Sequence, residues 1–231
     1  MAITVYWACY EPEWMRAKEP EPVYQNFSRD KKNLDTGISL CPSVKDYMNN
    51  TFSMKSMYDY EFEVREGMDG AWTNTYNQEF YDNHVMVRSR ENKLFSFLQK
   101  TIFFTEEDSL IMSGGIFPYL EDNNITQNCI TIPGKFDIGK WFRMMDFAFF
   151  LRDGHDKFII KSDEIYQYVH FDTNEKIVFK QFRMDETLHS YAKDILRSKD
   201  FKAKKVTALK DHYPLMKHKK SIIKQIKDNL I

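Results

Sequence analysis

A two-residue alternation of apolar and polar side chains runs through the middle of the chain. Between positions 58 and 65, tyrosine, phenylalanine and valine at the even positions alternate with aspartate, glutamate and arginine at the odd positions. This pattern is typical of a strand that buries one face and exposes the other, as strands of antiparallel sheets do. By the same reasoning we expect strands over residues 3–9, 84–88, 94–105, 110–112, 128–132, 146–151, 157–161, 165–171 and 176–183.

The hydrophobic period changes to 3.6 near the C-terminus. Beyond Arg183 an apolar stripe, with Asp185 placed as a cap, predicts a helix, and a second amphipathic helix begins near Pro214. A shorter helix is expected after Pro42, with an apolar face made of Val44, Tyr47, Met48 and Phe52.

These elements predict a mainly β, α+β fold, in which an antiparallel β-sandwich or a jelly-roll or barrel is closed by C-terminal helices. Turn residues at 173–174 predict a hairpin between the last two strands. We expect residues 1–184 to form a β-rich core domain. Residues 185–231 form a basic helical segment that packs on this core or extends from it.

Composition agrees with a packed core, because 42% of the 231 residues are hydrophobic and 16% are aromatic. The net charge of −1 conceals an asymmetry, since residues 197–231 hold eleven lysines and arginines against three acidic residues. Such a segment is expected to meet an acidic surface: nucleic acid, a partner protein or the body of the protein itself. For nucleic acid, the predicted phosphate contacts are Lys204, Lys205, Lys219 and Lys220. The isoleucines interleaved at helical spacing favour docking on the core instead.

The cysteines point to a reducing compartment. Cys9, Cys41 and Cys129 are scattered and contain no CxxC pair, which argues against a disulfide framework or a zinc site. The N-terminus does not have the pattern of a signal peptide, and no apolar run approaches the ~18 residues of a membrane span. We therefore expect a soluble, cytoplasmic protein without a membrane partner.

The most distinctive stretch, residues 129–143, combines glycines, a proline and an aromatic pair between two predicted strands. One interpretation is a loop that presents Lys140, Trp141 and Arg143 to a ligand or partner, because an aromatic face beside a guanidinium suits a base, a sugar or an anion. The interpretation that we prefer is a structural corner in which Trp141 seals the end of the sandwich. The two glycines do not form a phosphate loop, because no GxGxxG pattern follows.

A His-x-Asp pair, His170 and Asp172, ends a predicted strand. In non-haem iron oxygenases on β-sandwich folds, such a pair joins a distant histidine in a facial triad. The candidates for the third ligand are His84, His189 and His212, and His189 is poorly placed because it lies on a predicted helix. We prefer the interpretation that the pair belongs to a polar strand face, shared with the two preceding tyrosines.

Several segments resemble uncharacterised proteins encoded by tailed bacteriophages of the marine myovirus type. The segments are Tyr6-Trp-Ala-Cys with Glu11 and Trp14, Phe103-Phe-Thr-Glu-Glu, Pro118-Tyr-Leu-Glu-Asp and Ile132-Pro-Gly-Lys-Phe-Asp-Ile-Gly-Lys-Trp-Phe-Arg. The similarity covers roughly residues 1–185. It implies no reaction, but it implies a viral protein that acts in the infected cell or in the virion.

Taken together, the sequence predicts a phage-encoded, non-enzymatic binding or assembly protein without a cofactor, which associates with itself or with a protein partner. No complete catalytic motif is recognisable, and this absence carries the prediction. The first alternative is a cupin-like, iron-dependent oxygenase that uses His170 and Asp172. The second is nucleic-acid binding through the basic C-terminus.

Overall fold

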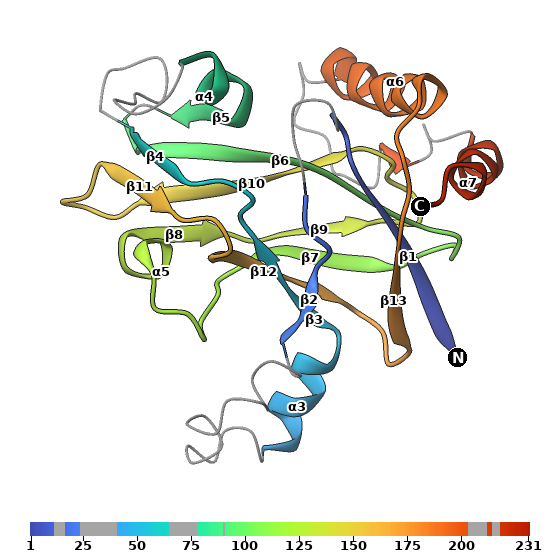
Figure 1. Ribbon diagram of the computed structural model, residues 1–231, viewed down its shortest axis with the longest axis horizontal. Helices are drawn as coiled ribbons and strands as arrows, with labels where there is room; N and C mark the ends of the chain where they lie inside the picture. The colour runs from blue at the N-terminus through green and yellow to red at the C-terminus, as the bar shows by residue number, and fades with distance from the viewer. Residues whose placement is uncertain (12–16, 24–40, 65–77, 90, 203–211, 214–217) are drawn as a thin grey trace.

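Two sheets face each other and enclose an aromatic core (Figure 1). The computed structural model describes residues 1–11, 17–23, 41–64, 78–89, 91–202, 212–213 and 218–231. Its strands are β1 (Ala2–Cys9), β2 (Glu21–Pro22), β3 (Thr51–Lys55), β4 (Tyr60–Glu63), β5 (Val85–Ser89), β6 (Leu94–Thr105), β7 (Ile111–Ile116), β8 (Cys129–Ile132), β9 (Gly134–Asp137), β10 (Met144–Leu151), β11 (Lys157–Ile160), β12 (Ile165–Phe171) and β13 (Lys176–Gln181). Its helices are α3 (Pro42–Asn49), α4 (Gln78–His84), α5 (Asn124–Asn128), α6 (Glu186–Lys202) and α7 (Lys219–Asp228).

The pairing of the strands is almost entirely antiparallel. The larger sheet has the order β13-β1-β6-β10-β8, with β5 also paired to β6, and the smaller sheet has the order β2-β3-β12-β7-β9. Strands β4 and β11 form a separate two-stranded ribbon. Among the described pairs only β1 and β13 run parallel. The predicted mainly β, α+β sandwich is therefore confirmed.

Alternation along the strands fills the space between the sheets. In β10, Met145, Phe147, Phe149 and Leu151 are buried, while the residues between them are partly exposed. At the left end in Figure 1 the β4–β11 ribbon closes the sandwich. Each fully buried side chain of this size stabilises the fold by about 1.5–3 kcal/mol.

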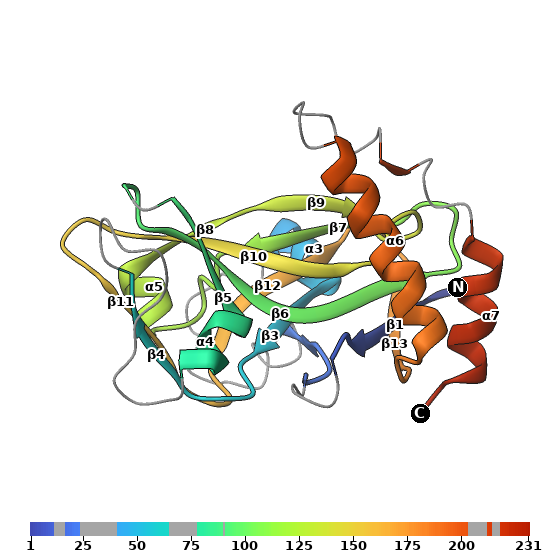
Figure 2. The same cartoon turned by 90° about the horizontal axis from the view of Figure 1, so that it is seen from above.

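The C-terminal helices cover the outer side of the larger sheet, where they lie side by side (Figure 2). Their apolar residues form a second core with β1 and β6, made of Tyr6, Ala8, Tyr10, Ile102, Phe104, Trp141, Phe142, Phe182, Met184, Leu188, Ala192, Ile195, Ile222 and Ile226. The predicted cap is present, because an Asp185 carboxylate oxygen accepts the Leu188 N–H at 2.8 Å. The helical segment therefore packs on the core.

The predicted hairpin at Thr173 and Asn174 is wrong. Strand β12 lies in the smaller sheet, whereas β13 lies beside β1 in the larger one, so the chain crosses between the sheets at this point. The Asn50 side chain holds the crossing by donating to the carbonyl groups of Thr173 and Glu175. Turn residues set a reversal of direction but not the partner that the next strand takes.

The predicted helix after Pro42 ends earlier than expected. Asn50 is its C-cap, and Phe52 belongs to β3, where its ring packs on Phe171 and Phe179 at 5.8 and 4.9 Å between centroids. Strand β9 falls in the stretch that the sequence analysis treated as a corner loop.

Asp185 joins the two C-terminal helices, because its second oxygen also accepts from the Gln225 and Asn229 side chains of the α7 region. We expect Asp185→Ala to lower the free energy of unfolding by about 1–3 kcal/mol, since it removes a cap and leaves two amide donors without this acceptor. Urea unfolding measures the loss. Lys224→Ala, at an exposed position of α7, is the control, and equal stability of the two variants would contradict the prediction.

His84 makes stability depend on pH. It is buried at the end of α4, where Nδ1 lies 2.6 Å from the Phe80 carbonyl oxygen, and burial lowers its pKa below the ordinary 6.5. Below pH 6.5 the imidazole is therefore protonated in the unfolded chain before it is protonated in the folded chain. The contribution of His84 to the free energy of unfolding is fully present above pH 6.5, and it is lost as the pH falls below 6.5 toward the lower pKa of the folded state.

We expect His84→Asn, which keeps a donor for the carbonyl, to flatten the dependence of unfolding free energy on pH between 7.5 and 5. His170, whose pKa burial also lowers, leaves a residual slope in the same direction. Urea titrations at several pH values measure both slopes. An unchanged slope in the variant would show that another group carries it.

Candidate functional site

The corner predicted to hold a binding loop is buried. Trp141 is 3% exposed and Arg143 is 6% exposed, with the guanidinium carbon 5.2 Å from the centroid of the Trp141 ring. Lys140 pairs with Asp137 at 2.8 Å, and Arg143 approaches Asp146 at 3.8 Å. As folded, Trp141 and Arg143 do not face a ligand in solvent. Trp141 has a structural role, but not at the end of the sandwich: its ring belongs to the second core, beneath the C-terminal helices.

The histidines proposed as metal ligands lie apart from one another. Asp172 is exposed next to His170. His84, at the end of α4, packs against the rings of Tyr60 and Phe80. His212 packs beside Trp141. Across the described ranges, no group of three or more His, Cys, Asp and Glu side chains could hold a metal ion. The predicted iron triad is therefore not assembled from these residues.

The basic C-terminus meets acidic and carbonyl groups of the protein itself. Lys227 pairs with Glu106 at 2.8 Å, and the Lys219 ammonium donates to the Glu107 carbonyl oxygen. Lys220 is exposed on α7. The predicted phosphate contacts Lys204 and Lys205 lie outside the described residues. Lys219 and Lys227 thus contact the protein's own body, one of the three acidic surfaces considered in the sequence analysis.

A group of aromatic side chains connects α3 and the turn after β7 to β12 of the smaller sheet. Figure 1 shows α3 at the lower end of this sheet, next to β3. Tyr47 of α3 stacks on His170 of β12 with ring centroids 4.9 Å apart and planes at 13°. Tyr119, in the turn after β7, meets Tyr168 of β12 edge-on at 5.5 Å. Tyr47 and Tyr119 are 42% and 44% exposed. We call the four residues Tyr47, Tyr119, Tyr168 and His170 the Tyr–His face.

An irregularity of β12 between Ile165 and Gln167 produces this face. The pairing registers shift on both sides of the strand, between Ile165 and Gln167 toward β3 and between Tyr168 and His170 toward β7. Tyr166 consequently points into the core, where it packs on Phe97 at 5.7 Å. A bulge thus separates Tyr166 from Tyr168 and His170, although simple alternation places all three on one side.

The protonation of His170 follows from its hydrogen bonds. The Thr51 hydroxyl donates its only proton to the Tyr47 carbonyl oxygen at 2.7 Å. His170 Nδ1, 2.9 Å from the same hydroxyl oxygen, must therefore be the donor in that pair. Burial lowers the pKa of His170, so the ring is neutral at pH 7 and Nε2 is the unprotonated nitrogen.

Acidic groups border the face. Glu121 is half-buried and hydrogen-bonds to the Tyr168 hydroxyl, and burial is the main reason that its pKa is raised. Lys55 of β3 donates to both carboxylate oxygens of Glu21 at 2.8 and 2.9 Å, so its charge is compensated. Glu164 influences Glu121 electrostatically. Of the charged residues named in this paragraph, three are glutamates, Glu21, Glu121 and Glu164, and one is a lysine, Lys55.

Sequence reasoning found only part of this site. It placed Tyr168 and His170 together on a polar strand face, but it assigned Tyr47 to the apolar side of its helix and gave Tyr119 no role. The spacing of apolar residues predicts which side of a helix faces the core. It does not predict whether a ring at the edge of that side, such as Tyr47, remains exposed. Nothing in the sequence brings the turn after β7 next to α3.

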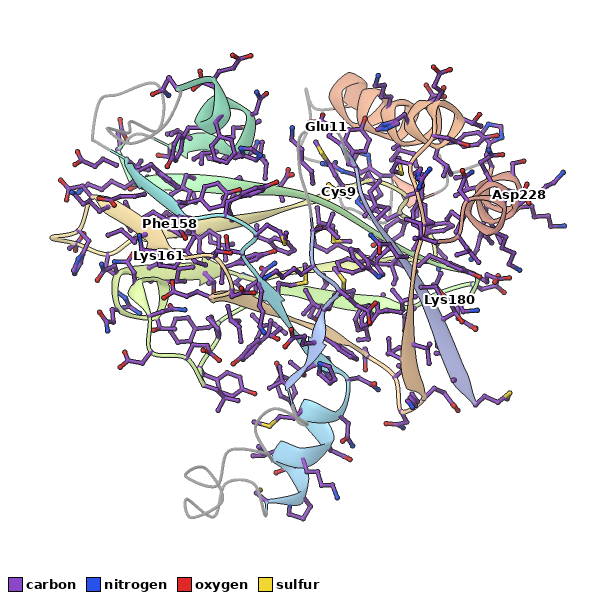
Figure 3. The ribbon with its side chains drawn as sticks, viewed as in Figure 1. Cys9, Glu11, Phe158, Lys161, Lys180 and Asp228 are labelled. Carbon is purple, nitrogen blue, oxygen red and sulfur yellow. The ribbon has the colours of Figure 1, made fainter. Side chains whose placement is uncertain are left out.

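An ion pair between Lys100 and Glu11, at the junction of β1 and β6, is partly buried and has a structural role. Lys100, 7% exposed at a bulge of β6 with φ of 50°, pairs with Glu11 just beyond β1, and Figure 3 labels Glu11 and the neighbouring Cys9. Burial raises the pKa of the Cys9 thiol, so it is not poised as a nucleophile. The Tyr10 N–H donates to the Lys100 carbonyl oxygen at 2.7 Å. These contacts fasten the segment after β1 to β6.

No helix in the described part of the chain is long and apolar enough to cross a membrane.

The sequence was also compared with known protein families and with curated proteins. No protein-family model matches the sequence, and no curated protein matches it.

Proposed function

We propose that this protein is a non-enzymatic binding protein whose ligand docks on the Tyr–His face. The single observation that supports this function is the pair of exposed tyrosine rings, each braced by a second ring. A braced ring offers a large contact area at little cost in side-chain entropy, since its orientation is already fixed. Exposed aromatic side chains of this kind are enriched where proteins bind ligands and partners.

The hydrogen bonds of the site argue against nucleophilic catalysis there. Thr51, His170 and Asp172 resemble a hydroxyl–imidazole–carboxylate series, and Asp172 does act electrostatically on His170. A catalytic histidine must accept the proton of the nucleophile. Here the Thr51 proton is donated to the Tyr47 carbonyl, and Thr51 is fully buried. Thr51, His170 and Asp172 therefore do not form a nucleophile–base pair, which agrees with a binding role for the face.

The wider setting of this function follows from the resemblance to tailed-phage proteins. It favours a binding protein that works in the cytoplasm of the infected cell or as part of the virion. Association with a protein partner or with a second copy stays a prediction, as does nucleic-acid binding through the C-terminal lysines. Native mass spectrometry and salt-dependent binding assays test these two predictions separately.

We expect the affinity for the ligand to fall about fivefold or more in Tyr47→Ala and in Tyr119→Ala, because stacking on one ring contributes about 1–3 kcal/mol. A panel of immobilised oligosaccharides, single-stranded DNA and methylated-lysine peptides, probed with the wild-type protein, identifies the ligand, and calorimetry then measures the affinities. Ile130→Ala, which shortens an exposed side chain on β8 of the other sheet, is the control. Unchanged binding in the double tyrosine variant would remove the proposal.

A further inference from the structure

The geometry points to a neutral oligosaccharide as the ligand of the Tyr–His face. This inference rests on the proposed function, and it narrows that function to one chemical class. Three properties of the face support it: the charge around the rings, the way the rings are arranged, and the polar groups beside them.

The charge around the face disfavours polyanions. Apart from Lys45 and Asp46, which precede Tyr47 on α3, the described charged residues considered around the face are four acidic ones, Glu21, Glu121, Glu164 and Asp172, and two basic ones, Lys55 and Lys135. One of the two cations is already bound by a carboxylate. Binding of nucleic acid needs several free lysines or arginines that displace counterions from phosphates. A phosphate or sulfate chain would instead meet the carboxyl groups of Glu121, Glu164 and Asp172.

The arrangement of the rings disfavours a cation. Quaternary ammonium groups are bound inside cages, where several aromatic faces surround the charge. In the Tyr–His face, Tyr47 lies flat on His170 at 4.9 Å, and the Tyr119 and Tyr168 rings meet at 5.5 Å, so each pair is closed on itself. What remains available is the outward side of each exposed tyrosine. Such platforms suit a flat ligand ring laid on top.

A pyranose ring fits a platform of this kind. Its C–H groups form an apolar side that stacks on an aromatic face, while its hydroxyl groups point outward around the rim. The face provides both kinds of hydrogen-bonding group for these hydroxyls. Glu121 and the unprotonated nitrogen of neutral His170 are acceptors, and the Tyr47 and Tyr119 hydroxyls can donate.

Two platforms imply a ligand of more than one sugar unit. Tyr47 contacts His170 at 4.9 Å and Tyr119 contacts Tyr168 at 5.5 Å, and these two partners are two residues apart on the same side of β12. The two exposed rings thus belong to one surface and can engage one chain. A single sugar would occupy one platform only and would gain only part of the binding energy.

The test uses calorimetry on the full chain with three neutral probes: cellohexaose, maltohexaose and the hexamer of N-acetylglucosamine. We expect at least one to bind, at least tenfold more tightly than its monosaccharide. We expect the affinity to fall about fivefold or more in Tyr47→Ala and in Tyr119→Ala, and to change less than about threefold in Tyr47→Phe, which keeps the ring. Because no free cation carries the contact, affinity should change less than twofold between 50 and 300 mM salt.

Three further probes make the failure informative: a heparin hexasaccharide, a single-stranded DNA decamer of thymidine, and a peptide with trimethylated lysine. If one of these binds through the two tyrosines while no neutral hexasaccharide does, the inference is wrong and the proposed binding function stands. If no probe depends on Tyr47 or Tyr119, both are wrong. Unchanged thermal unfolding of the variants shows that a loss of binding is not a loss of fold.

Discussion

Aromatic rings packed between the two sheets hold the sheets against each other. Phe97 of the larger sheet meets Tyr166 of the smaller sheet at 5.7 Å, and Phe103 meets Phe171 at 6.3 Å. Rings of this size interlock with preferred tilts, and a close-packed core does not deform continuously. The sheets therefore take one relative position. The residues on their outer sides are arranged by the same packing.

This constraint explains why the Tyr–His face exists. Tyr166 is needed in the core, where Phe97 and Phe147 contact its ring. The bulge in β12 allows Tyr166 to turn inward and still leaves Tyr168 and His170 on the outer side. A regular strand would put the three residues on one side, because side chains alternate at every step. The irregularity of β12 thus serves the core and shapes the candidate site together.

The sequence predicts those features that depend on local pattern. Strand β6 has the predicted bounds, 94–105, because a long aromatic and β-branched run has few other ways to bury itself. Its bulge at Lys100, with a left-handed backbone, has no local signal, since it arises from pairing with β1 and β10. The same holds for the site. His170 is recognisable in its strand, but its contact with Tyr47 depends on how α3 docks.

The two outer sides of the sandwich differ in a way that follows from the distribution of charge along the chain. Helices α6 and α7 cover the larger sheet, and described lysines of α7 meet Glu106 and the carbonyl of Glu107 there. The segment whose net charge is strongly positive thus lies on that side, with eleven lysines and arginines against three acidic residues in 197–231. On the side of the smaller sheet, the described carboxyl groups that act on Glu121 and His170 are Glu164 and Asp172, and Lys55 is bound by Glu21. A ligand that stacks on the rings of Tyr47 and Tyr119 gains most if it carries no charge, because it then pays neither repulsion by the carboxylates nor the desolvation of an ion.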